Sequence, residues 1–137
     1  MNIMNKYKLF TDGGARGNPG PAGIGGVLYN SKNEVVANFS VYLGKTTNNQ
    51  AEYKALLKGL ELALENKVEE LNCYLDSELV VKQLKREYKV KNKDLAPLFI
   101  KVWSLSLKFK KITFNHVTRD KNTIADALAN QAMDRAS

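Results

Sequence analysis

Four acidic residues lie at positions where the apolar pattern of this 137-residue sequence favours a different kind of side chain. Alternation along the first expected strand places Asp12 on the same face as Phe10. Glu52 heads a stripe of apolar residues at helical spacing, where an unpaired buried charge would be costly. Asp76 ends a later strand, and Asp126 lies beside the apolar stripe of the last helix. These positions predict a shared chemical role for the four acids.

Taken singly, each acid has an ordinary explanation, because Asp-Gly turns end many strands and acids favour the first turn of helices. Jointly they indicate a metal site. If the strand ends and helix starts that carry them meet at one sheet edge, their mutual repulsion requires cations. Magnesium binds a few carboxylates together with phosphate oxygens. Two such ions, roughly 3.5–4 Å apart, activate water and stabilise the leaving oxygen of a phosphodiester. The sequence contains no cysteine and histidine cluster typical of zinc.

Three strands joined by short connections open the chain and predict an antiparallel meander. The first covers residues 6–12 and the second covers residues 24–29, after a turn-rich segment. The third follows a turn at residues 30–33. Its apolar residues alternate along one face: Val35, Ala37, Phe39, Val41 and Leu43.

Alternating helices and strands follow and predict parallel pairing. The clearest helix spans residues 49–65, with Asn48 or Asn49 as its cap and Glu52 in its first turn. A fourth strand covers residues 71–76, and Ser77 caps the next helix. The remaining expected elements are a helix over 95–107, a strand containing Ile112, Phe114 and His116, and a last helix capped by Asn122-Thr123. We therefore expect an α/β fold with a five-stranded mixed sheet flanked by helices, forming a single domain over residues 1–137.

The charge balance favours a polyanionic partner such as nucleic acid. Lys and Arg number 21 against 14 acids, which gives a net charge of +7. Residues 82–93 alone hold six of these basic residues. The single cysteine, Cys73, permits no internal disulfide and is expected to be buried. Residues 1–6 show no signal-peptide core and no apolar run is long enough for a membrane span, so we expect a cytoplasmic protein with no membrane contact.

The four acids belong to sequence blocks that resemble ribonuclease H, type 1. The blocks occur in the order of that family and cover nearly the whole chain. They are Thr11-Asp12-Gly13-Gly14 with Gly17-Asn18-Pro19-Gly20-Pro21-Ala22-Gly23, Thr47-Asn48-Asn49-Gln50-Ala51-Glu52, Asp76-Ser77, and Ala125-Asp126-Ala127-Leu128-Ala129.

The resemblance implies cleavage of the RNA strand of an RNA/DNA hybrid, leaving a 3′-hydroxyl and a 5′-phosphate. It implies that Asp12, Glu52, Asp76 and Asp126 bind two Mg²⁺ ions, with Mn²⁺ also supporting activity. Asp12 would bridge the ions, and Glu52 and Asp76 would lie nearer the ion that activates water. Discrimination of RNA requires contact with the 2′-hydroxyl. The residues expected to bind the hybrid are Gly13, Gly14, Asn18, Thr47, Asn49, Gln50 and Ser77, with Thr47 on a phosphate of the DNA strand.

Some of these residues also have structural explanations. Asn18 fits a turn, and Ser77 fits a helix cap. The basic residues of 82–93 either follow the DNA backbone or form a solvated face. Long family members insert a basic helix here, and the space between Leu84 and Leu95 is too short for a full one. We therefore expect weaker hybrid affinity than in the long forms.

The only histidine departs from the family pattern. Many family members carry a catalytic histidine on a mobile loop that contains glycine. Here His116 falls in an expected strand, and residues 118–122 contain no glycine. We expect Arg119 to be the polar group nearer the reaction.

Two other functions remain open at this point: a nucleic-acid binding module with a decayed site, and another metal-dependent nuclease or strand transferase, for example one acting on DNA. Four intact acids disfavour a pure binder, because negative charge repels phosphate. The Gly13-Gly14 and Asn48-Asn49-Gln50 blocks favour the hybrid. Nothing in the sequence requires more than a monomer.

Overall fold

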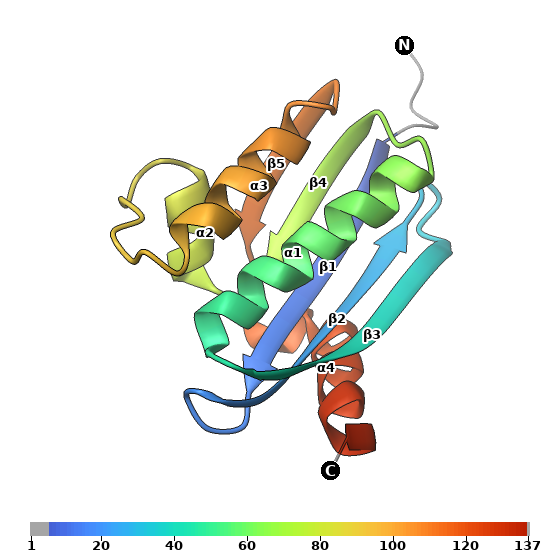
Figure 1. Ribbon diagram of the computed structural model, residues 1–137. Coiled ribbons are helices and arrows are strands. Elements are labelled where there is room, and N and C mark those ends of the chain that lie inside the picture. The colour runs from blue at the N-terminus through green and yellow to red at the C-terminus, as the bar shows by residue number, and fades with distance from the viewer. Residues whose placement is uncertain (1–5, 137) are drawn as a thin grey trace.

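The computed structural model describes residues 6–136 and contains a five-stranded sheet in the order β3-β2-β1-β4-β5 (Figure 1). β1 to β3 pair in antiparallel orientation, whereas β4 pairs in parallel with both β1 and β5. This confirms the predicted mixed sheet. Residues 1–5, where the sequence predicts no signal peptide, lie outside the described part. The strands are β1 (Lys6–Ala15), β2 (Gly20–Tyr29), β3 (Val35–Thr46), β4 (Glu70–Leu75) and β5 (Lys111–His116).

Helices flank the sheet on both faces (Figure 1). α1 and α3 lie over one face and contact each other, and α4 packs against β2, β3 and β1 from the other face. Within residues 6–136, no helix is both long enough and apolar enough to cross a membrane. The helices are α1 (Asn48–Glu65), α2 (Glu78–Leu84), α3 (Ala96–Ser106), the short 3₁₀ helix η2 (Arg119–Lys121) and α4 (Thr123–Ala136).

The larger apolar core lies between the sheet and the α1–α3 layer. Alternation sends Leu9 of β1 and Cys73 of β4 toward this layer, where both are fully buried. Leu56 and Leu60 of α1 meet them at helical spacing. The buried position of Cys73 confirms its expected role as a small apolar residue. This packing holds α1 firmly across β1, so the start of α1 has a defined place at the sheet edge.

Two predicted element ends need correction. β1 does not end in an Asp-Gly turn, because it continues through the glycines to Ala15 and pairs with β2 along this length. The cap of α1 is Thr47, not Asn48 or Asn49, and its Oγ1 accepts a hydrogen bond from the Gln50 N–H at 3.2 Å. The helix therefore starts at Asn48, and Glu52 lies beyond its first turn.

The apolar face predicted for β3 is only partly buried. Phe39 is buried, but Val35 and Val41 are 57% and 37% exposed. β3 is an edge strand, and irregular pairing with β2 at Ala22/Gly23 and Leu28/Tyr29 interrupts the alternation. Sequence periodicity predicted the strand but could not reveal its position at the edge.

Residues 85–95 connect α2 to α3 and contain no helix. This confirms that the full basic helix of the long forms has no counterpart in this segment.

Candidate active site

Strand register brings two of the acids together. β1 and β4 run in parallel, and Thr11 and Leu75 form their last pair. Asp12 and Asp76 are the next residues along the two strands, so they lie at the same sheet edge. Both belong to the face that also carries Phe10. The predicted meeting of strand ends is therefore present.

Glu52 reaches this edge because α1 lies unusually close to β1. A side chain on Gly13 would place its Cβ 2.3 Å from the backbone oxygen of Ala51, a distance that excludes any residue but glycine. The Gly13 N–H donates a 2.5 Å hydrogen bond to Glu52 Oε1. Gly13 thus serves helix packing, a role that the sequence, which gave it only as a residue expected to bind the hybrid, did not predict. The Cβ of an alanine at position 14 would have its nearest contact at 3.8 Å.

Asp126 enters the cleft from the other side of the sheet, in the first turn of α4 as predicted. A glycine again permits the approach, because a Cβ on Gly25 would lie 2.5 Å from backbone atoms of α4. Gly25 is the β2 partner of Asp12. Two glycines that flank Asp12 therefore allow helices on both faces to converge on it.

The four acids line one cleft, which also contains Gly13, Gly14, Asn49, Ser77 and Arg119. Carboxylate oxygens of Asp12, Glu52 and Asp76 lie within 4.8 Å of one another. Asp12 and Glu52 are buried, at 9% and 6% exposure. Glu52 Oε2 is buried and has no hydrogen-bond partner in the described structure. An unpartnered carboxylate oxygen beside two other acids fits a hard divalent cation, whose preferred ligands are oxygens.

Crowding and burial shift the protonation of the two inner acids. The pKa of Asp12 is raised to about 7, chiefly because burial disfavours its charge. The Asp76 and Asp126 carboxylates raise the pKa of Asp12 further, whereas the neighbouring Glu52 carboxyl lowers it. Burial, then the charge of Asp12, also raises the pKa of Glu52 well above its ordinary value. Because their pKa values are raised, Asp12 and Glu52 hold protons more readily than free carboxylic acids, and a bound cation would displace these protons.

The structure divides the predicted hybrid-binding residues between two neighbouring hollows. Gly13, Gly14 and Ser77 line the acidic cleft, and Asn49 lies at both hollows. Ser77 also caps α2, accepting a hydrogen bond from the Val80 N–H at 3.3 Å. The second hollow is lined by Asn18, Thr47, Asn49, Gln50, Asn92, Asp94 and Leu95.

Several of these polar groups already have partners within the fold. Asn18 Oδ1 accepts a hydrogen bond from the Asn48 N–H at 3.0 Å, which ties the β1–β2 loop to the start of α1. Gln50 Oε1 accepts one from the Thr46 hydroxyl. Their amide N–H groups and the Thr47 hydroxyl are the groups through which the predicted contacts to a nucleic acid would form.

Arg119 and His116 occupy different surroundings. Arg119, in η2, lines the acidic cleft. His116 is exposed at the end of β5, where it faces Glu78 closely enough to help lower the pKa of that carboxyl, after the larger effects of Lys82. This arrangement agrees with the expectation that Arg119 is nearer the acids, while its role stays a prediction.

Sequence reasoning missed Asn122 as part of the site. Its side chain does not cap α4 through Oδ1, which is buried without a partner in the described structure. Its Nδ2 instead donates to the Thr11 carbonyl at 2.9 Å and to Asp76 Oδ2 at 3.3 Å. Asn122 is only 2% exposed. Its two hydrogen bonds link the start of α4 to β1 and to the end of β4. The sequence signal that could have revealed this role is the position of Asn122 four residues before Asp126, one helical turn away.

A second missed network supports Asp126. Asn130, one turn further along α4, donates its Nδ2 to Asp126 Oδ1 at 3.3 Å. Arg16 donates to Asn130 Oδ1 at 3.3 Å and forms a 2.7 Å ion pair with Asp134. The helical spacing of Asp126, Asn130 and Asp134 was visible in the sequence, but their link to the β1–β2 loop was not.

Comparisons with known proteins agree with this geometry. The family model described as "Reverse transcriptase-like" matches residues 10–132. The chain is 42% identical over 133 residues to the bifunctional protein Rv2228c of Mycobacterium tuberculosis, covering 96% of this chain and 36% of that protein. It is 40% identical over 131 residues to ribonuclease HI of Halobacterium salinarum, covering 96% of this chain and 66% of that protein. The chain thus spans only part of these relatives.

A solved structure gives the same result in three dimensions. LC11-RNase H1 in complex with an RNA/DNA hybrid superposes with a TM-score of 0.89 at 42% identity, covering 95% of this chain and 98% of that one. Sequence match, strand order and cleft together show that this chain belongs to the ribonuclease H family, type 1.

Proposed function

We propose that the chain is a metal-dependent endoribonuclease that hydrolyses the RNA strand of RNA/DNA hybrids, leaving 3′-hydroxyl and 5′-phosphate ends. The observation that carries this proposal is the convergence of Asp12, Glu52, Asp76 and Asp126 on one cleft, with Glu52 Oε2 buried and unpartnered. The hybrid in the structure of LC11-RNase H1 supports the choice of substrate. Residues 1–137 would act as one domain and a monomer, and the cytoplasmic location stays a prediction from the sequence.

The four acids would hold two Mg²⁺ ions, or Mn²⁺ in their place. When bound, the ions supply an activated water and neutralise charge on the scissile phosphate. The chain itself supplies position. The Gly13 N–H orients Glu52, Asn122 orients Asp76, and Asn130 orients Asp126. Hydrogen bonds of this kind hold ligands in place and tune their affinity for metal.

The polar residues around the acids would read the hybrid. Gly14 offers an open backbone beside the cleft, and Asn49 bridges the cleft and the second hollow. Thr47, in that second hollow, would contact a DNA-strand phosphate. In this arrangement the RNA strand of the duplex would lie at the acids, and the DNA strand would cross the start of α1. The basic residues of 82–93 would add contacts that salt weakens.

One assay separates the proposed function from its alternatives. Labelled RNA/DNA hybrid, RNA duplex and DNA duplex are each incubated with Mg²⁺, Mn²⁺ or chelator. We expect cleavage of the hybrid alone, and only with metal. Binding without cleavage under every condition would identify a decayed binding module. Cleavage of DNA duplex would identify a different nuclease.

The role of Arg119 needs its own comparison. We expect Arg119→Ala to lower kcat, because this side chain lines the cleft, whereas His116→Ala should leave kcat nearly unchanged. A large loss of kcat in the His116 variant alone would contradict the assignment.

A further inference from the structure

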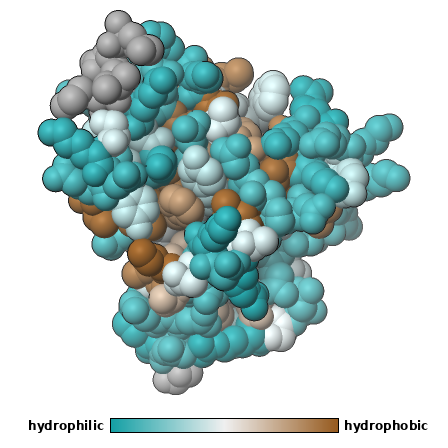
Figure 2. All heavy atoms as spheres, turned by 180° about the vertical axis from the view of Figure 1, so that it is seen from behind, coloured by the Kyte–Doolittle hydropathy of each residue, from teal (hydrophilic) through white to brown (hydrophobic). Residues whose placement is uncertain are grey.

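A third cavity, separate from the acidic cleft and from the second hollow, lies between the sheet and the start of α4. It measures about 280 Å³ and is bounded by Phe10, Val27 and Tyr29 of the sheet and by Ile124 and Ala125 of α4. In the described structure no residue lines both this cavity and the acidic cleft. The face of the molecule opposite α1 carries exposed apolar side chains between polar ones (Figure 2), and Ile124 is 54% exposed.

The floor of the cavity is a fixed aromatic surface. Phe10 stacks on Tyr74 at 4.7 Å between ring centroids and 16° between planes. Tyr29 meets Phe10 edge-on at 5.9 Å and 87°. Because each ring restrains the other, a flat ligand would find a surface that needs little ordering on binding. Nucleic-acid bases stack on such surfaces regardless of base type.

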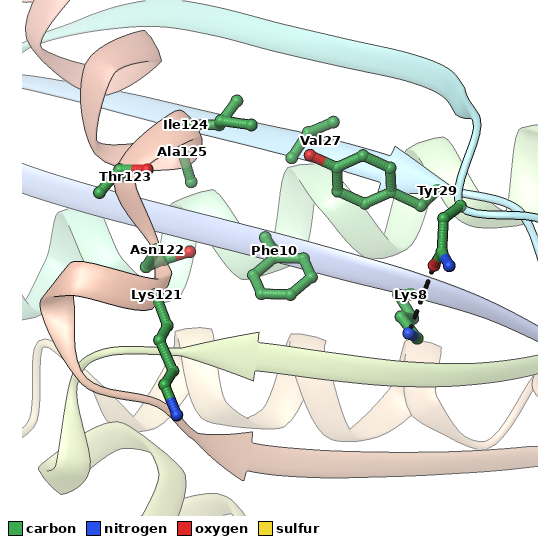
Figure 3. Close-up of a pocket in the computed structure, with 10 residues that line it drawn as sticks. Lys8, Phe10, Val27, Tyr29, Lys121, Asn122, Thr123, Ile124 and Ala125 are labelled. Carbon is green, nitrogen blue, oxygen red and sulfur yellow. Dashed lines mark hydrogen bonds between the residues drawn. The ribbon is translucent and has the colours of Figure 1, made fainter.

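The charged groups in the cavity wall are both cations. Figure 3 shows Lys121 and Lys8 at opposite ends of the cavity, with Phe10 between them. Lys8 Nζ is held by Asn33 Oδ1 at 3.3 Å. No carboxylate belongs to the residues that line this cavity in the described part of the chain. An anion at either end would therefore meet a lysine without repulsion from the wall.

Asn122 adds a polar group to the wall. Its Nδ2 is used by Thr11 and Asp76, but its Oδ1 is buried without a partner in the described structure. Figure 3 shows the Asn122 oxygen on the side that faces Phe10. Because this oxygen is closed to solvent, it makes the boundary of the cavity polar but offers no direct contact to a ligand.

We propose that this cavity binds a phosphorylated nucleoside, with the base on Phe10 and Tyr29 and phosphates on both sides of the sugar at Lys8 and Lys121. The aromatic floor matches a base, and the cations at its two ends match the phosphates of the same ligand. The site goes beyond the proposed nuclease reaction, because it uses neither the acids nor a metal. The ligand is either a free nucleotide or a nucleotide within a single strand.

Binding is measured by amide NMR titration in the presence of chelator, with adenosine, adenosine 5′-monophosphate and adenosine 3′,5′-bisphosphate as probes. We expect affinity to rise about threefold to fivefold with each phosphate, as for exposed ion pairs. Shifts should centre on Phe10, Tyr29 and Ile124. A short RNA trinucleotide that binds more tightly than the bisphosphate assigns the site to single strands, and equal affinity assigns it to free nucleotides.

Matched variants test the contacts. Lys8→Met and Lys121→Met keep the aliphatic part of the side chain but remove its charge. Each variant should lose the increase in affinity that one phosphate provides. Lys58→Met, at an exposed position of α1, should change nothing. Asp12→Asn should keep nucleotide binding, so a failure here is distinct from a failure of the proposed cleavage.

Three results would overturn the proposal. One is equal affinity for adenosine and its bisphosphate, and another is an equal loss in the Lys58 variant. The third is a set of shifts centred on Asp12, Gly13 and Asn49, which would show that the nucleotides bind in the acidic cleft.

Discussion

The acidic cleft and the basic segment of residues 82–93 use charge in opposite ways. In the cleft, Asp12 and Glu52 are almost fully buried and are held by helix contacts and hydrogen bonds. In the basic segment, five of the six cationic side chains are exposed. They are held by surface contacts, such as that of the Arg86 guanidinium, which lies 5.1 Å from the centre of the Trp103 ring. Buried charges interact strongly, whereas exposed ones are screened by water and salt. The cleft is therefore suited to chemistry, and the basic segment is suited to binding a nucleic acid with an affinity that salt can adjust.

The largest expected effect comes from Asp12→Asn. Removing the central carboxylate should lower the single-turnover rate of hybrid cleavage by at least about a thousandfold, a loss typical for a group that stabilises transition-state charge. Hybrid binding, measured with Ca²⁺ in place of Mg²⁺, should change little. Rapid cleavage by this variant would show that the cleft does not carry the chemistry.

The same substitution should stabilise the metal-free protein. Because burial raises the pKa of Asp12 from 3.8 to about 7, folding favours its neutral form. Stability from this group is therefore complete below pH 4 and is lost as pH rises through 7. At pH 8 the Asn variant should gain up to ~4 kcal/mol in the free energy of unfolding, measured in urea with chelator. If the Asn variant is stabilised no more at pH 8 than at pH 4, the raised pKa of Asp12 is contradicted.

Gly13→Ala tests whether helix packing holds the cleft together. The new Cβ would overlap the Ala51 carbonyl, so we expect a loss of about 2–3 kcal/mol in the free energy of unfolding. Gly14→Ala is the matched control, since its Cβ meets no atom closer than 3.8 Å. Equal losses in the two variants would refute the role assigned to Gly13.

Asn122→Ala tests the link between Asp76 and β1. It leaves the Thr11 carbonyl without its donor and should cost about 1–2 kcal/mol in the free energy of unfolding. Mg²⁺ binding, measured by calorimetry, should weaken about tenfold because Asp76 loses its support. Asn72→Ala removes a hydrogen bond to Thr113 away from the cleft and should leave Mg²⁺ affinity unchanged. A tenfold loss in both variants would indicate a general structural effect.

The smallest effects belong to the basic segment. Lys89→Gln combined with Lys91→Gln should weaken hybrid binding about twofold to fivefold and reduce the salt dependence by about 0.7–0.9 per lost phosphate contact. The cleavage rate at saturating hybrid should stay the same. A large fall in that rate would mean that the segment takes part in chemistry, and the contrast with the cleft would fail.

Local patterns were sufficient for much of the fold. Strict alternation and helical spacing depend on neighbours in the chain, so they predicted all five strands and the helices α1, α2, α3 and α4, with errors at some of their ends. Those errors have a common cause. Thr47 rather than Asn48 caps α1, and the Asn48 side chain instead accepts a hydrogen bond from the Ala15 N–H, a contact with the distant end of β1. β3 is partly exposed because it lies at the sheet edge, which periodicity does not encode.

The sequence by itself determined the elements, their order and the four acids that break the apolar pattern, because these follow from local periodicity and from motifs. Only the tertiary structure decided which groups meet. It placed Gly13 under α1, directed the Asn122 side chain to Asp76 although Asn122 precedes α4, and separated Phe10 from Asp12 into two cavities on one strand face. The physical reason is that burial, pKa and hydrogen-bond partners depend on contacts between residues far apart in the chain.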